Sequence, residues 1–283
     1  MKIGDVTEII DAVLSGSNDS KYDVNNDGEV NINDVTYAID AALNQDQDEP
    51  TPDDGVYTVN GVTFRMVNVE GGTFTMGAAN TEIGSSTHEK PQHEVTLDAF
   101  SICETQVTQE LWTAVMGECH SVNHGDKKPM ENVSWNECQT FISKLNELTG
   151  KTFRLPTEAE WEFAARGGNE SHNYLFAGGN SVKNDNIAWY SSNSNGTTHD
   201  VATKNPNELG LYDMSGNVNE WVNDWYVPYN SAAQTNPVGP TAGTFKIYRG
   251  GDYKQSASNC RVHFRYMRGV NEKFDYVGFR LAL

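Results

Sequence analysis

Oxygen-bearing side chains recur near the start of the chain at the spacing that a calcium ion requires. The twelve-residue stretch 23–34 has such side chains at its positions 1, 3, 5, 9 and 12, and Gly28 at position 6. Calcium binds oxygen ligands around a sharp turn, and a helix–loop–helix calcium loop has this spacing, with Glu in place of Asp at position 12. A solvated acidic loop is the alternative. The expected ligands are the side chains of Asp23, Asn25, Asp27, Asn31 and Asp34 and the peptide carbonyl of Glu29.

Two copies of one helical segment must position this loop. Residues 5–14 and 34–43 lie 29 positions apart and are identical at seven of ten positions. Each copy has Val, Ile and Leu at i, i+3 and i+4 spacing, a narrow apolar face that one helix cannot bury alone. We therefore expect the helices to pack together in a small all-α module over residues 1–44. An acidic linker with two prolines should follow at residues 45–55.

The repeat and its loop resemble a dockerin module, which has an EF-hand-like fold. The resemblance implies calcium binding and a cohesin-like protein partner outside the cytoplasm. The first calcium loop of that pattern is truncated, since Asp5 would be its last position, and we expect a trimmed chain. We therefore expect a secreted or cell-surface bacterial protein whose leader is not part of this chain.

The last 37 residues, 247–283, contain side chains suited to recognition. An Arg-Gly-Gly sequence at 249–251 and a Gly-Phe-Arg sequence at 278–280 enclose a stretch that no amphipathic period fits over its full length. Tyr, Asn, Ser and Arg on a supported loop give large contact area at low rotamer cost. We expect a ligand-binding surface; the alternative is an irregular segment threaded through the core. The expected ligand-binding residues are Asp252, Tyr253, Lys254, Gln255, Ser256, His263, Phe264, Tyr266, Met267, Arg268, Asn271, Lys273, Phe274, Asp275 and Tyr276.

Several motifs resemble the formylglycine-generating enzyme, or sulfatase-modifying factor, family. They are the two ends of the tail and the segments NVSW at 132–135, RLPTEAEWEFAARGG at 154–168 and GLYDMSGNVNEW at 210–221. The resemblance implies an α+β, loop-rich domain of C-type-lectin-like fold over residues 56–283, with calcium built in. The tail also resembles variable proteins of diversity-generating retroelements, which have the same fold and vary residues between these two ends.

Cys260 is the one candidate for covalent chemistry. Enzymes of the family hold copper(I) with two cysteines five positions apart, because soft thiolates suit that metal. Cys260 matches the later position, but Gln255 stands at the earlier one, and an amide cannot replace a thiolate. We therefore expect a non-catalytic ligand-binding protein without copper, in which Cys260 is a small buried residue. The alternative is a copper-dependent oxidase, or another sulfatase-modifying-type enzyme, that uses Cys260 as a low-pKa thiol.

The resemblance also implies two calcium sites in the second domain. Two acids and two backbone carbonyls around a tight glycine turn suit a hard cation. The residues that match the first site are Asp213, Gly216, Val218 and Glu220. Those that match the second site are Asn186 and the carbonyl of Ile187, with Asp200 as an acid downstream.

Helix starts are predicted at Ser134 and Thr157, because each is followed three residues later by a glutamate that completes a capping box. In the second of these helices Glu158 and Glu162 are four residues apart. We expect this pair to lie on a solvated face near the helix N-terminus, where acids are favourable. Acid–base catalysis by the two carboxylates is the alternative.

Composition limits the partners. The chain of 283 residues has a net charge of −19, which argues against nucleic acid or an anionic membrane surface. No apolar run is long enough to span a membrane. Four cysteines leave disulfide pairing open, and the absence of a C-x-x-C spacing argues against a zinc site. The expected partner of the tail is a protein or a glycan; a purely structural module delivered by the dockerin-like segment is a further possibility.

Overall fold

The computed structural model describes residues 3–25, 27–45, 55–82 and 84–283, and the chain divides into two compact units. Unit 1 is Met1–Asp54 and unit 2 is Gly55–Leu283. Most of the expected linker, positions 46–54, lies outside the described residues.

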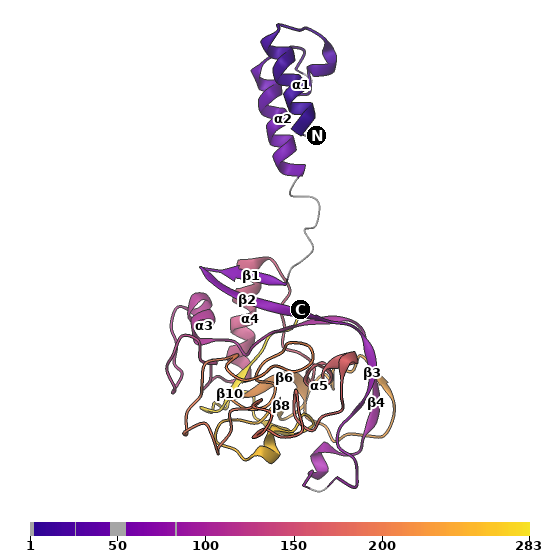
Figure 1. The fold of residues 1–283 in the computed structure, drawn as a ribbon, viewed down its shortest axis with the longest axis vertical. Coiled ribbons are helices and arrows are strands. Elements are labelled where there is room, and N and C mark those ends of the chain that lie inside the picture. The colour runs from indigo at the N-terminus through magenta and orange to yellow at the C-terminus, as the bar shows by residue number, and fades with distance from the viewer. Residues whose placement is uncertain (1–2, 26, 46–54, 83) are drawn as a thin grey trace. The chain divides into compact units, whose positions relative to one another are not determined.

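Unit 1 is a pair of helices whose connection contains a short 3-10 turn and most of the stretch 23–34, the end of which belongs to the second helix (Figure 1). The apolar faces of the two helices meet, and Val6, Ile9, Val35 and Ala38 are buried together. This packing is what two helices with narrow apolar stripes require, since each stripe covers the other. The elements are α1 (Ile3–Leu14), η1 (Ser20–Tyr22) and α2 (Ile32–Gln45).

Unit 2 combines helices, small sheets and long loops, which confirms the expected α+β, loop-rich fold. One sheet has the strand order β1-β2-β5 and another has the order β3-β4-β7. Along β2 most buried residues alternate with exposed ones, as expected of a strand that covers a core with one face. The strands are β1 (Val56–Val59), β2 (Val62–Val69), β3 (Gly72–Met76), β4 (His93–Leu97), β5 (Phe100–Cys103) and β7 (Gln234–Thr235).

The third sheet holds both ends of the tail. Its order is β10-β6-β8-β9, with β10 parallel to β6 and the other pairs antiparallel. Because β6 lies between β8 and β10, one strand fixes the start and the end of the tail (Figure 1). The strands are β6 (Asn219–Trp225), β8 (Lys246–Arg249), β9 (Arg265–Arg268) and β10 (Val277–Phe279).

The helices of unit 2 begin at side-chain caps. The predicted capping boxes at Ser134 and Thr157 are both present, and Gly150 ends one helix in the left-handed conformation with φ 67°. The helices are α3 (Gln109–Met116), α4 (Trp135–Thr149) and α5 (Glu158–Ala165), with short 3-10 turns η2 (Thr87–Glu89), η3 (Gly168–Glu170) and η4 (Ala257–Cys260).

Helix α5 differs from its prediction. All eight of its residues are buried, so the expectation of a solvated face carrying Glu158 and Glu162 is wrong. The physical reason is that strands β3 and β6 contact the helix and tail arginines neutralise its acids.

The end of the tail is part of the core. Phe279 meets the rings of Phe141 and Trp112 edge-on, at 5.3 and 6.1 Å between centroids, and these two rings stack at 5.2 Å. The tail is therefore threaded through the core at its end. Within the described ranges, none of the helices has the length and apolar character needed to cross a membrane.

Candidate functional site

Between its two buried ends the tail turns toward solvent. We use the name tail surface for twelve of its residues that are exposed or half-buried. The exposed members are Lys254, Ser256, Tyr266, Asn271 and Lys273, and the half-buried members are Gln255, Phe264, Met267, Arg268, Phe274, Asp275 and Tyr276. All twelve are among the predicted ligand-binding residues, so the structure places these on one segment at the surface of unit 2.

Aromatic rings and a guanidinium group form the centre of the tail surface. The Arg268 guanidinium carbon lies 4.7 Å from the centroid of the Tyr266 ring and 5.5 Å from that of Phe274. Phe274 in turn stacks on Tyr276 at 5.1 Å. Such a cluster offers large, rigid side chains that combine apolar area with polar groups.

Ion pairs fix the edges of the tail surface. The Lys254 ammonium lies 2.5 Å from the carboxylate of Asp275, which links the two halves of the tail. The Lys273 ammonium lies 2.5 Å from Glu137 at the start of α4. Exposed pairs of this kind contribute little stability, but they restrict where the loops can lie.

Three predicted ligand residues, Asp252, Tyr253 and His263, are buried, with exposed fractions of 0, 1 and 3%. The Asp252 carboxylate accepts hydrogen bonds from the Asn219 side chain at 2.6 Å and the Lys254 backbone at 2.7 Å. Burial nevertheless raises the pKa of Asp252 to about 6. The His263 ring lies between two glutamate carboxylates, at 2.7 and 2.9 Å. The prediction that these three side chains contact a ligand at the surface is therefore wrong; they support the tail surface from below.

Buried arginine–glutamate pairs, which we call the ionic frame, hold the tail. The Arg280 guanidinium donates two hydrogen bonds of 2.8 Å to Glu220. Burial opposes ionisation of Glu162, but its neighbouring arginines lower its pKa to about 2. Paired in this way the charges are stable, whereas loss of one partner would leave an uncompensated buried charge. The pairs of the frame are Arg280 with Glu220, Arg265 with Glu158, and Arg249 with Glu162.

Cys260 is fully buried, as expected for a small apolar residue. It packs in a cluster with Phe176, Ile187 and Tyr190, and this burial raises the pKa of the thiol well above its usual range. None of the four cysteines, all of which lie in described residues, forms a disulfide. The thiolate form that nucleophilic attack or copper binding would need is therefore disfavoured.

The residues implied as the first calcium site of unit 2 do converge, but on a nitrogen atom. The side-chain amide nitrogen of Gln106 lies 2.8 Å from the Val218 carbonyl and 3.0 Å from the Glu220 carboxylate. The Asp213 and Gly216 carbonyls lie 3.3 and 3.4 Å from the same nitrogen. At the second implied site the Lys204 ammonium bonds the side-chain oxygen of Asn186.

Backbone N–H groups of the loop of unit 1 donate hydrogen bonds to the carboxylates of Asp23 and Asp34. The Asp34 carboxylate accepts backbone N–H groups of Asn31 and Val24 at 2.8 and 2.9 Å, which lower its pKa, the Asn31 bond having the largest effect. Asp23 accepts those of Asp27 and Gly28 at 3.1 and 3.0 Å. One residue of the loop, position 26, lies outside the described residues. In the described part of the chain no three His, Cys, Asp or Glu side chains form a metal cluster, so a cation here would need amide and carbonyl oxygens as well.

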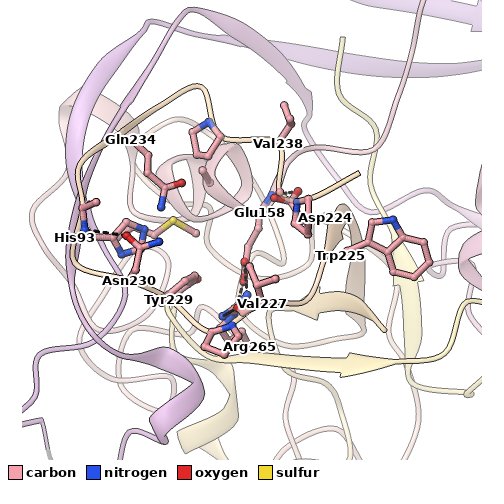
Figure 2. Close-up of a pocket in the computed structure, with 17 residues that line it drawn as sticks. His93, Glu158, Asp224, Trp225, Val227, Tyr229, Asn230, Gln234, Val238 and Arg265 are labelled. Carbon is pink, nitrogen blue, oxygen red and sulfur yellow. Dashed lines mark hydrogen bonds and ion pairs between the residues drawn. The ribbon is translucent and has the colours of Figure 1, made fainter. Parts of the chain in front are cut away.

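A second candidate site is a cavity of about 360 Å³ beside α5 and β6 (Figure 2). Glu158 lies between Asp224 and Arg265 in its wall (Figure 2). The Asp224 carboxylate accepts the backbone N–H of Glu158 at 2.8 Å, and burial together with the charge of Glu158 raises its pKa to about 7. His93 and Tyr229 line the same cavity.

Sequence reasoning did not predict this cavity or the partners of the ionic frame. The signal available was the presence of three alternating glutamates, at 158, 160 and 162, and of several arginines in the tail. Nothing in one sequence says which of these charges meet, since the partners are more than 80 positions apart.

With this fold the chain belongs to the sulfatase-modifying factor enzyme 1-like domain family, whose model matches residues 58–283. Chaperone protein LppX of Paenibacillus barcinonensis is 30% identical, over 72% of this chain and 83% of that protein. Formylglycine-generating enzyme of Mus musculus is 35% identical over 60% of this chain, which spans about half (48%) of the mouse protein.

Two solved structures share the fold. Treponema denticola variable protein 1 superposes with a TM-score of 0.74 and 34% identity, over 82% of this chain and 99% of that chain. PvdO from Pseudomonas aeruginosa superposes with a TM-score of 0.67 and 26% identity, over 81% and 97%. Unit 2 therefore has the same fold as Treponema denticola variable protein 1.

The environment of Asp224 predicts a pH effect on stability. Its folded pKa is above its unfolded value, so the folded state binds more protons between these two values and the free energy of unfolding falls as pH rises toward 7. Between pH 5 and pH 8 we expect the free energy of unfolding of the wild type to fall by roughly 1–3 kcal/mol more than that of the Asp224→Asn variant. Urea unfolding at several pH values measures this; parallel curves for the two proteins would contradict it.

Proposed function

We propose that the protein is a non-catalytic ligand-binding protein that displays the tail surface on a lectin-like scaffold. One observation carries the proposal: side chains of a single segment divide into a buried set held by the ionic frame and a set that is exposed or half-buried at the surface. A segment of this kind can change its exposed side chains while its backbone stays in place. The similarity to Treponema denticola variable protein 1 supports the same division of roles.

The chemistry of the tail surface fits a protein or glycan ligand. Tyr266, Phe274 and Tyr276 provide faces for apolar groups or sugar rings, and Arg268 with Lys254 provides donors for acidic groups or hydroxyls. We further propose that a diversity-generating retroelement varies these positions. A near-copy of the coding sequence for the tail, next to a reverse transcriptase gene, would support that origin.

For unit 1 we propose calcium binding at the loop 23–34 and a cohesin-like partner. Hydrogen bonds from backbone N–H groups to the carboxylates of Asp23 and Asp34 support the calcium proposal, because they hold the loop curved around its oxygen ligands. A dockerin-like role would place the protein outside the cytoplasm, secreted or at the cell surface. Calcium would order the loop, and the chain would use unit 1 to attach unit 2 to an assembly.

The non-catalytic proposal predicts no oxidation of a substrate cysteine. We expect the full chain, incubated with copper, oxygen and a sulfatase-type cysteine peptide, to leave the peptide unchanged in mass spectrometry, since Cys260 is buried without a second thiolate. A formylglycine-generating enzyme with both cysteines is the positive control. Aldehyde formation by the wild type would overturn the proposal.

A second experiment asks whether this chain lacks only one catalytic cysteine or the whole catalytic site. Gln255→Cys restores the second thiol, and Ser256→Cys adds a thiol at the neighbouring position as the matched control. Oxidation of the peptide by Gln255→Cys, but not by Ser256→Cys, would show that the catalytic site is intact except for the missing cysteine. The proposal that the natural protein is non-catalytic is decided by the wild-type measurement.

The calcium proposal for unit 1 predicts that removal of one loop carboxylate weakens calcium binding. Asp34→Ala removes the carboxylate at position 12 of the loop, and we expect at least a 100-fold loss of calcium affinity in isothermal titration of the full chain. Asp19→Ala, an exposed acid outside the loop, is the control and should bind as the wild type does. Unchanged binding by Asp34→Ala would show that calcium does not bind this loop.

A further inference from the structure

Gln106 occupies an unusual place in the core of unit 2. The residue is fully buried between β5 and α3, and its amide nitrogen is the point on which four oxygens of the segment 213–220 converge. These are three backbone carbonyls and one carboxylate of the four residues to which the family resemblance assigns a calcium ion; Asp213 contributes its carbonyl in place of the expected carboxylate. In this chain the segment instead closes around a nitrogen that belongs to the protein.

The distances fit hydrogen bonds and do not fit a cation beside the amide. The four oxygens lie 2.8–3.4 Å from the nitrogen, whereas calcium ligands lie at 2.3–2.6 Å from the ion. An amide nitrogen has two hydrogens and no lone pair for a metal. The two short bonds, to Val218 and Glu220, use these hydrogens, and the two longer contacts share them.

The surroundings also determine the orientation of the amide. Reversed, the amide would place its oxygen against four other oxygens with no proton between them. The orientation that satisfies the four acceptors leaves the Gln106 amide oxygen buried and without a hydrogen-bond partner. A cation at the same point would require the reversed orientation, so a cation and the amide orientation of this structure exclude each other.

The charge at this point is already neutralised. Glu220 is the one carboxylate of the set whose oxygens face Gln106, and it accepts two hydrogen bonds from Arg280 and one of 2.6 Å from the indole of Trp161. One oxygen of the Asp213 carboxylate accepts the backbone N–H of Ala202 at 2.9 Å, while the other is buried without a hydrogen-bond partner, and burial raises the pKa of this carboxyl to about 6. The carboxylate that faces Gln106, that of Glu220, is therefore already paired with a cation of the protein.

At the second implied cation position a protein nitrogen contacts one of the implied ligands. The Lys204 ammonium donates to the side-chain oxygen of Asn186 at 2.7 Å and lies 3.8 Å from the ring centroid of Trp189. An ammonium brings a positive charge and hydrogen-bond donors to the oxygen that the resemblance assigns to calcium. The side chain of Asp200, the acid expected downstream, is exposed.

We propose that protein nitrogens, the amide of Gln106 and the ammonium of Lys204, take the places of both calcium ions, so that unit 2 folds and holds its tail without a divalent cation. On this proposal neither Asp213, Gly216, Val218 and Glu220 nor Asn186 and Ile187 bind calcium. This inference does not depend on the proposed function, and it leaves the loop of unit 1 as the calcium candidate.

Terbium luminescence tests the proposal on the full chain, because terbium binds calcium sites and emits when an excited indole is close to it. All six tryptophans lie in unit 2, so excitation at 295 nm reports on terbium near that unit, and the Asp34→Ala variant subtracts any signal from the loop of unit 1. Trp161 and Trp189 lie beside the two positions. For the wild type we expect less than a twofold rise over the buffer signal.

A gain of binding is expected from one substitution. Gln106→Glu replaces the donor with a carboxylate and leaves five oxygens converging, so we expect at least a tenfold rise in tryptophan-excited emission that millimolar calcium removes. Gln92→Glu, the same charge change at an exposed glutamine, is the control and should give no rise.

The wild type decides the proposal even if Gln106→Glu does not fold. A tenfold calcium-sensitive emission from the wild type would overturn it. So would a shift of several degrees in the tryptophan-monitored unfolding temperature between calcium and a chelator; we expect agreement within about 1 °C.

Discussion

The buried pair of Arg280 and Glu220 is the interaction on which unit 2 depends. Arg280 follows the last strand of the chain and Glu220 lies on β6, the strand that fixes both ends of the tail. Each side chain is fully buried, so neither charge has water as a substitute partner. Trp161 and Gln106 donate to the same carboxylate and connect it to α5 and to the segment before α3. The chain end, the central sheet and two flanking segments therefore meet at one carboxylate.

This arrangement separates what holds the tail from what the tail presents. Its backbone is fixed at both ends by strands and at intermediate points by buried side chains such as Asp252 and Arg265. The residues between, among them Tyr266 and Arg268, have their polar groups near solvent. Because fold stability and exposed chemistry reside in different side chains, the surface can differ between relatives on one scaffold. The proposed ligand binding uses this separation on a scaffold that the chain shares with Treponema denticola variable protein 1.

Local signals in the sequence predicted local structure well. Capping residues placed the starts of α4 and α5, and long motifs identified the fold before any contact was known. Contacts between segments far apart in the sequence could not be predicted. Helical periodicity shows that Glu158 and Glu162 share a face, but not that tail arginines cover it. Residue types suggested an exposed Asp252, whereas its burial follows from a partner 33 positions away. Gln106 gave no signal, because its role exists only where four remote oxygens converge.

The most direct test compares the tail surface with the ionic frame in one denaturation experiment. A combined variant replaces five surface residues by alanine, and a second variant carries only Arg280→Met. The five are Lys254, Tyr266, Arg268, Asn271 and Lys273. We expect the combined variant to lose less than about 2 kcal/mol of unfolding free energy. Arg280→Met should lose roughly 3–5 kcal/mol, because it leaves Glu220 buried without its partner. Equal losses, or a larger loss in the combined variant, would contradict the account.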